Sequence, residues 1–175
     1  MKQMKQMHFG TKQILALAMT RLDYNEYRGW TLPDDEDGTD AGYLVEYVDG
    51  GATNHPDHAG YISWSPADVF DNAYKASGDM SFGHAIEAMK LGHKVARAGW
   101  NGKEMWVALT SGSSFAAENA KLGHAAYHRA MECPEPETPI NLLPHIDMRA
   151  ADGSMVVGWL ASQTDMLADD WGLVE

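Results

Sequence analysis

The sequence predicts an α+β protein with antiparallel sheets, and two observations lead to this class. Segments with the aromatic and β-branched composition of strands outnumber the long amphipathic helices. They also follow one another at short distances, separated by glycine, proline, asparagine and aspartate, so neighbouring strands should pair locally. With 175 residues, the chain has room for one medium domain or two small ones.

We expect a flexible N-terminus over residues 1–9, followed by two domains. The N-terminal residues are polar and lack the apolar centre of a signal peptide. A small α+β domain covers residues 10–76, and a short join leads to a small antiparallel sheet domain with packed helices over residues 80–175. Residues 111–139 are polar and alanine-rich and include a proline-rich run, which predicts a variable insertion on the surface.

The first domain should begin with a short helix over residues 19–28, whose leucine and two tyrosines give it a mixed face. Residues 43–48 and 61–64 are aromatic and β-branched, which predicts two strands joined by a long turn. A helix over residues 65–75 follows, because Ser65 is a good N-cap and a proline occupies the first turn.

The second domain opens with a helix that Ser81 should cap. Its apolar residues recur at the helical period until Gly92 ends it. Strands over residues 95–97 and 105–109 follow, and the Asn-Gly pair in the connection between them is a good hairpin signal.

The rest of the second domain contains four further elements. Within the insertion, residues 114–131 predict a polar, alanine-rich helix. Residues 143–148 and 155–159 should form a second hairpin through an Ala-Asp-Gly turn. A helical turn over residues 164–167 and a last strand over residues 171–174 complete the prediction.

Composition argues against several classes of partner. A net charge of −12 disfavours binding to nucleic acid polymers, because duplex affinity depends on neutralising phosphates with Lys and Arg. It leaves room for a small anionic ligand, which needs only a few donors. No apolar run approaches the roughly 20 residues that cross a bilayer, and the single cysteine, Cys133, fits a reducing cytoplasm. We therefore expect a cytoplasmic protein without a membrane partner.

No catalytic or metal-binding pattern stands out. His124 and His128 would share a helix face, but no glutamate follows His124, so the hydrolytic zinc motif is missing. Cys133 lies between Glu132 and Pro134, without a cationic neighbour to activate its thiol. There is neither a P-loop nor a Gly-x-Ser-x-Gly turn. We expect no catalytic residue, no metal and no cofactor.

Two segments instead combine large aromatic side chains with small polar ones, residues 92–106 and residues 159–171. A flat aromatic face beside an amide, a hydroxyl and a carboxylate is suited to hold a nucleobase or a ribose. This combination favours a protein that binds a small nucleotide-like molecule over an enzyme.

Each of these residues also has a purely structural interpretation. A tryptophan in a turn, Trp100, is either folded back onto the core or offered to a partner. Asn101 is a normal turn residue before a glycine. Either Ser162 or Thr164 can cap the helical turn, with Asp165 in its first turn, and such a helix start can also bind an anion.

The two segments carry a resemblance to a known family. Residues 80–103, resumed at residues 148–153 and 158–171, resemble the Thoeris anti-defence two family of phage and prophage proteins. The resemblance implies a sponge that sequesters glycocyclic ADP-ribose, a signal made by bacterial TIR-domain immune proteins, without degrading it. Some members also hold cyclic oligonucleotide signals. It further implies a homotetramer in the cytoplasm of the bacterial host, with nucleotide pockets built between subunits.

The resemblance also implies a set of ligand-binding residues. Trp100 and Asn101 of the Gly-Trp-Asn-Gly turn would line the pocket, with Trp100 stacked on the ligand. Arg97 is the nearest cation for a pyrophosphate. The other candidates by position in the two motifs are Trp159, Ser162, Thr164, Asp165, Phe82 and Met105. The insertion at residues 111–139 can cover or reshape this pocket.

The first domain looks like a separate small phage protein family with no established activity. Residues 1–79 hold six basic and thirteen acidic residues, a net charge of −7. This acidity keeps open an alternative function, in which the chain is a protein–protein inhibitor or a DNA mimic acting on a host factor.

Overall fold

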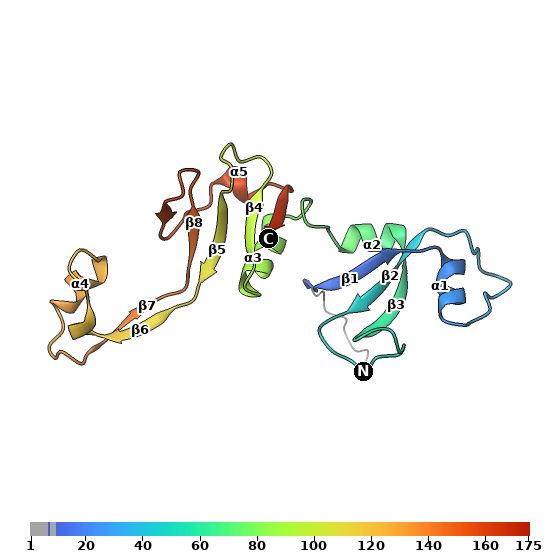
Figure 1. Ribbon diagram of the computed structural model, residues 1–175, viewed down its shortest axis with the longest axis horizontal. Helices are drawn as coiled ribbons and strands as arrows, with labels where there is room; N and C mark the ends of the chain where they lie inside the picture. Colours follow the sequence, from blue (N-terminus) through green and yellow to red (C-terminus); the bar gives the residue numbers. More distant parts are fainter. Residues whose placement is uncertain (1–6, 8–9) are drawn as a thin grey trace. The chain divides into compact units, whose positions relative to one another are not determined.

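The computed structural model describes residue 7 and residues 10–175, and it confirms the α+β class with antiparallel sheets (Figure 1). Except for Met7, the expected flexible N-terminus lies outside the described residues. The chain forms two compact units, Met1–Lys75 and Ala76–Glu175. Within the described residues, no helix has the length and apolar character needed to cross a membrane.

The first unit contains a three-stranded antiparallel sheet of β1 (Ile14–Ala18), β2 (Gly42–Tyr47) and β3 (Tyr61–Pro66), with β2 in the middle. Strand β1 was not predicted from the sequence. Its five residues form an unbroken apolar run without the alternation that identifies a half-buried strand. Pairing of Leu17 with Leu44 places it in the sheet.

Among the described residues, two helices belong to this unit, one between β1 and β2 in the chain and one directly after β3. Helix α1 (Arg21–Tyr27) starts at Thr20, whose side chain accepts a hydrogen bond from the Asp23 amide at 3.1 Å. The prediction that Ser65 caps α2 (Ala67–Ala73) is wrong, because β3 continues through Pro66 and Ser65 pairs with Tyr43 in the ladder. Pro66 takes the N-cap position without a side-chain hydrogen bond.

The second unit contains a five-stranded antiparallel sheet in the order β10–β4–β5–β8–β9. Its strands are β4 (Lys94–Arg97), β5 (Trp106–Thr110), β8 (His145–Arg149), β9 (Met155–Val156) and β10 (Trp171–Val174). Both predicted hairpins, β4–β5 and β8–β9, are present. Helix α3 (Phe82–Lys90) packs on the sheet through Ala85 and Met89, against the fully buried Val95, Val107 and Trp171.

Both ends of α3 follow the sequence prediction. Ser81 is the N-cap and accepts from the His84 amide, while the His84 ring accepts from the Ser81 amide at 3.3 Å. This reciprocal capping box satisfies two free donors of the first turn. Gly92 follows the helix with φ +92°, a left-handed conformation that favours glycine.

The insertion differs from its prediction. No single helix covers residues 114–131. The segment instead contains β6 (Ser113–Ala116), the 3₁₀ turn η1 (Ala117–Asn119), α4 (Ala125–Ala130) and β7 (Pro139–Leu142). β6 and β7 pair, with Phe115 opposite the buried Ile140. This non-local pairing outweighs the helix propensity of the alanines, and Gly123 with φ +92° interrupts any continuous helix.

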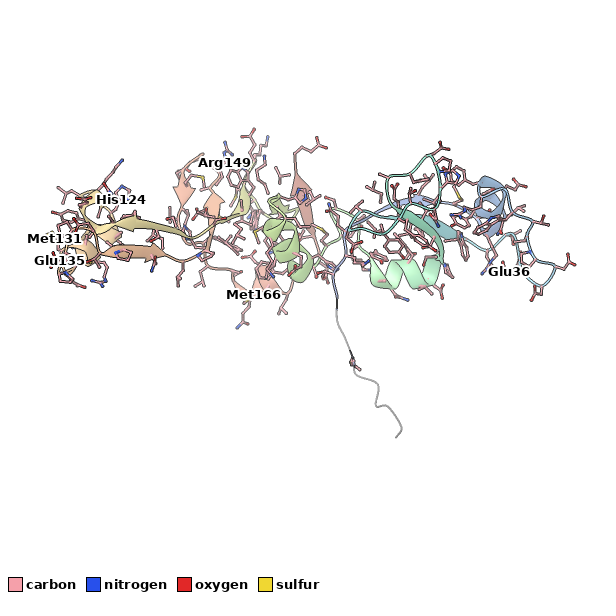
Figure 2. The ribbon with its side chains drawn as sticks, turned by 90° about the horizontal axis from the view of Figure 1, so that it is seen from below. Glu36, His124, Met131, Glu135, Arg149 and Met166 are labelled. Carbon is pink, nitrogen blue, oxygen red and sulfur yellow. The ribbon has the colours of Figure 1, made fainter. Side chains whose placement is uncertain are left out.

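The insertion forms an arm that continues from β5 and β8, away from the five-stranded sheet (Figure 1). His124, Met131 and Glu135 mark its far end (Figure 2).

We predict that Trp171→Ala lowers the free energy of unfolding by about 3–5 kcal/mol, because the ring is fully buried and its removal leaves a large cavity. Urea denaturation followed by circular dichroism measures the change. Leu173→Ala, in the same strand but 42% exposed, is the matched control and should cost much less. Equal losses in the two variants would contradict the placement of Trp171 in the core.

Candidate functional site

Four aromatic rings gather in the second unit. Trp100, Trp159 and Phe82 are half-buried and pack around the fully buried Trp171. The ring centroids of Trp100 and Trp159 lie 5.4 and 6.4 Å from that of Trp171, and the rings meet edge to face. Phe82 lies 5.3 Å from Trp171. Such pairs are stabilising beyond the area they bury, so they hold the two half-buried indoles in fixed orientations.

These rings come from three separate segments. Phe82 is the first residue of α3, and Trp100 lies in the connection between β4 and β5. The prediction that Trp159 ends a strand is wrong, because β9 stops at Val156 and Gly158, with φ +75°, turns the chain. The Trp159 amide then donates to the Ile146 carbonyl at 2.7 Å, which holds the backbone at Trp159 against strand β8.

Asp165 links the aromatic cluster to the helical turn α5 (Gln163–Met166). Its carboxylate accepts hydrogen bonds from the Trp100 indole at 3.0 Å, from Arg97 at 2.9 Å and from the Ser162 hydroxyl at 2.7 Å. Burial by itself would raise the pKa of Asp165. The hydrogen bonds from Ser162, Arg97 and Trp100 outweigh that effect and lower the pKa to about 2. The carboxyl group is therefore ionised at neutral pH.

Arg97 lies between two carboxylates. Besides Asp165, it donates from Nε to Asp170 at 2.7 Å, and its side chain is only 13% exposed. Hydrogen bonds to Asp170 and Asp165 raise the pKa of Arg97, and the Arg97 hydrogen bond lowers the pKa of Asp170. The guanidinium predicted for a pyrophosphate is thus already neutralised within the protein, and an anionic ligand would have to compete with both carboxylates.

Ser162 is the N-cap of α5, as one of the two sequence alternatives proposed. Its hydroxyl accepts from the Asp165 amide at 3.1 Å, and the Asp165 carboxylate accepts from the Ser162 amide at 3.2 Å. This capping box occupies the Ser162 and Asp165 amides and places a carboxylate at the helix start, where the expected anion would bind. Thr164 is exposed, and its backbone carbonyl accepts from Arg97 at 3.3 Å.

The turn that carries Trp100 is held by close packing. A Cβ atom on Gly102 would lie 2.2 Å from the Met105 sulfur and 2.6 Å from the Ala151 side chain, so only glycine fits between the two hairpin turns. Met105 is half-buried and also packs against the core of the second unit. Asn101 is exposed in the same turn.

The structure brings most of the predicted site residues together. The aromatic cluster includes Trp100, Trp159 and Phe82, and the hydrogen-bond network joins Arg97, Trp100, Ser162, Thr164 and Asp165. The exposed groups at the surface of this region are Asn101, Ser162 and Thr164. Asn101 follows Trp100 in the chain, and Ser162 and Thr164 belong to the α5 segment whose Asp165 binds the Trp100 indole.

Sequence reasoning missed Asp170 and Gly99. The Gly99 amide donates to Asp170 at 2.7 Å, so this carboxylate holds both Arg97 and the start of the Trp100 turn. Strand pairing is the signal that could have identified Asp170. Trp171 lies opposite Arg97 in the β10–β4 register, which brings the preceding aspartate close to that arginine.

Within the described part of the chain, no three His, Cys, Asp or Glu side chains gather as a metal site requires.

The second unit is similar in sequence to known proteins. Residues 80–174 match the family model of the Thoeris anti-defense 2-like domain. Over 95 residues, 54% of this chain, the sequence is 39% identical to a protein from Bacillus phage SP01 named Thoeris anti-defense 2, and the match spans 94% of that protein. All nine predicted site residues lie within the matched range.

We predict a pH-dependent effect for Asp165→Asn. The ordinary pKa of this group is 3.8 and the folded value is about 2, so its contribution to stability is complete above about pH 4 and is lost as the pH falls towards 2. The difference in unfolding free energy between the parent protein and Asp165→Asn should therefore shrink by about 2 kcal/mol between about pH 6 and pH 2. Urea denaturation across this range measures it.

Asp169→Asn is the matched control, since Asp169 is exposed and adjacent to the network. A difference for Asp165→Asn that stays constant with pH would show that its carboxylate is not held by these hydrogen bonds.

Proposed function

Because residues 80–174 make this chain a member of the Thoeris anti-defense 2-like family, we propose that it is a phage anti-defence protein that binds and sequesters a nucleotide immune signal without cleaving it. The signal we propose is glycocyclic ADP-ribose made by TIR-domain proteins, with cyclic oligonucleotides as further ligands. The observation that carries the proposal is the pair of half-buried indoles, Trp100 and Trp159, whose centroids lie 6.0 Å apart in the family-matched region.

The geometry of these rings supports binding of a base or ribose. Each indole has one side packed on the core and remains partly exposed, so it offers a rigid apolar surface. Asn101, the chain neighbour of Trp100, adds an exposed amide, and Thr164 adds an exposed hydroxyl, whereas the Ser162 hydroxyl is already bonded to Asp165. Stacking contributes affinity, and such polar groups contribute selectivity.

The state of the carboxylates supports retention of the ligand rather than its cleavage. Cleavage of a glycosidic or phosphoester bond by this site would need a general acid, a general base or a nucleophile. The pKa values of Asp165 and Asp170 are lowered by their hydrogen bonds, so neither carboxyl carries a proton to donate at neutral pH. Both also form ion pairs with Arg97.

We also propose that the second unit self-associates, which the family resemblance implies as a homotetramer. Three apolar side chains near the site are largely exposed, with Val157 at 74%, Leu160 at 90% and Leu167 at 81%. They flank Trp159 and Asp165 in the chain. A second copy that covers them would remove this apolar surface from water and would place further groups beside the indoles.

The acidic loop of the first unit gives less support to the alternative of a DNA mimic. Glu36 and Asp40 both bind Arg21, at 3.0 and 3.1 Å, and Asp37 binds the hydroxyl of Thr39 at 2.7 Å. Part of the negative charge therefore stabilises the loop itself. A mimic would instead present a regular array of free carboxylates.

We predict that the protein depletes free glycocyclic ADP-ribose from solution and that heat denaturation returns the ligand chemically intact. Trp100→Ala should weaken binding by about 1–3 kcal/mol, the usual contribution of stacking one base on an aromatic ring. Calorimetry gives the affinity, and chromatography of the released ligand identifies it.

Trp106→Ala is the matched control, because Trp106 lies on β5 of the same sheet but outside the aromatic cluster. Recovery of a cleaved product would identify an enzyme and overturn the proposal. Unchanged affinity in Trp100→Ala would remove that ring from the site.

We predict that Leu160→Asp converts an oligomer into a smaller species. The side chain is 90% exposed in a single copy, so the substitution should change the stability of the isolated subunit by no more than about 0.5 kcal/mol. Size-exclusion chromatography with light scattering measures the mass. Leu122→Asp, at an 82% exposed leucine of the insertion, should leave the mass unchanged. A parent protein that is already monomeric would contradict self-association.

A further inference from the structure

The first unit contains a hollow of about 440 Å³ with an aromatic lining. It lies between α1, the loop that follows α1 and strand β3, and its walls include Tyr24, Trp30, Tyr61 and Trp64. The volume falls in the range of sites for small organic ligands. Nothing in the family-matched region contributes to it.

Two of these rings are held in place by the fold, and the other two are exposed to solvent. Tyr24 is buried, and the Trp64 indole donates to the Met19 carbonyl at 3.0 Å, so both rings are held by the fold. Trp30 and Tyr61 are 54% and 46% exposed. Trp30 meets Tyr24 edge to face, with centroids 6.2 Å apart. A planar ligand would therefore find a preformed aromatic surface that needs little reorganisation.

Arginine side chains reinforce this surface. The guanidinium of Arg28 lies 4.3 Å from the centroid of Trp30, and that of Arg21 lies 4.4 Å from the centroid of Trp64. Cation–π contacts of this kind hold an indole in place from one face. The Nη1 atom of Arg28 is buried and has no hydrogen-bond partner within the described residues. Arg28 is not among the residues that line the hollow, so its part there is to support the Trp30 ring.

Two amide side chains at the hollow are already oriented. Asn25 donates one N–H to the Arg21 carbonyl at 2.9 Å. Asn54 pairs with both the N–H and the carbonyl of Ile62, each at 2.8 Å. Because an amide NH₂ group has two donors, Asn25 and Asn54 each retain one N–H beyond these bonds. Oriented amides beside aromatic rings are suited to the edge of a heteroaromatic ring.

Charge decides between neutral and phosphorylated ligands. Residues 1–75 hold six basic and twelve acidic residues, a net charge of −6. The cation at the hollow, Arg21, is bound by Glu36, which Figure 2 labels on the loop after α1, and by Asp40. A phosphate would therefore meet a negative field with Arg21 already engaged, so a neutral ligand is favoured.

We infer that this hollow is a second ligand site, which binds a neutral nucleoside with its base stacked on Trp30 and Tyr61 and its ring edge at Asn25 and Asn54. The inference rests on the first unit alone and is independent of the signal-binding proposal for the second unit.

The test is calorimetric titration of the full chain with adenosine, and separately with adenosine 5′-monophosphate. Adenosine should bind with one site per chain in the first unit, and the monophosphate should bind there more weakly. Trp30→Ala should weaken adenosine binding about 5- to 140-fold, the equivalent of one stacked base. Trp30→Phe retains a ring and should lose less.

Control variants make the result specific. Val69→Ala, at a 55% exposed residue of α2 outside the hollow, should leave adenosine binding unchanged, as should Trp100→Ala in the second unit. A thermal melt of Trp30→Ala checks that the unit stays folded, which we expect because Trp30 is 54% exposed.

Three outcomes would overturn the inference. One is the absence of saturable adenosine binding up to about 1 mM. Another is binding that Trp100→Ala abolishes and Trp30→Ala does not, which would assign adenosine to the second unit. The third is tighter binding of the monophosphate through Trp30, which would show that the site is built for an anion. None of these results depends on whether glycocyclic ADP-ribose binds the second unit.

Discussion

The ion pairs of Arg97 with Asp165 and Asp170 hold the second unit in the arrangement from which the candidate site is built. They join strand β4 to the turn α5 and to the entry to β10, both of which lie about seventy positions further along the chain. The Arg97 and Asp165 side chains are only 13% and 14% exposed, so their ion pair is less screened by water than a fully exposed one, and loss of either partner would leave the other charge poorly compensated. The orientation of Trp100 depends on the same carboxylate, because its indole N–H donates to Asp165.

The ion pairs of Arg97 also affect which ligands the candidate site can bind. A site in which the cation is bound by two carboxylates attracts an anionic ligand only weakly, so aromatic surface and neutral polar groups must supply more of the affinity. In the proposed site, Trp100 and Trp159 would provide that surface on one copy of the chain. A partner copy that covers the exposed Leu160 and Leu167 would enclose the rings further and exclude water from them. In the proposed function, self-association and ligand binding therefore depend on one another.

Local chemistry in the sequence predicted the elements whose ends are set by neighbouring residues. Helix α3 was predicted from Ser81 and Gly92, and the start of α5 from a short choice that included Ser162, because caps act over three or four positions. Elements that form only by pairing with residues distant in the chain could not be predicted. Strand β1 exists because β2 pairs with it, and the insertion is a strand pair where composition favoured a helix. The bond between Arg97 and Asp170 likewise follows from the register of β10 against β4.

A rigid site is better suited to sequestering a ligand than to catalysis. A catalyst must bind the transition state more tightly than the bound substrate, and it needs groups that change protonation or move during the reaction. A sponge needs tight binding of the ground state, which is favoured when the binding groups are already ordered before the ligand arrives. Trp100 is fixed by Asp165 and by packing on Trp171, and the glycine at position 102 locks its turn against Ala151. A ligand that stacks there would lose little affinity to ordering of the protein, which suits retention of an unchanged molecule.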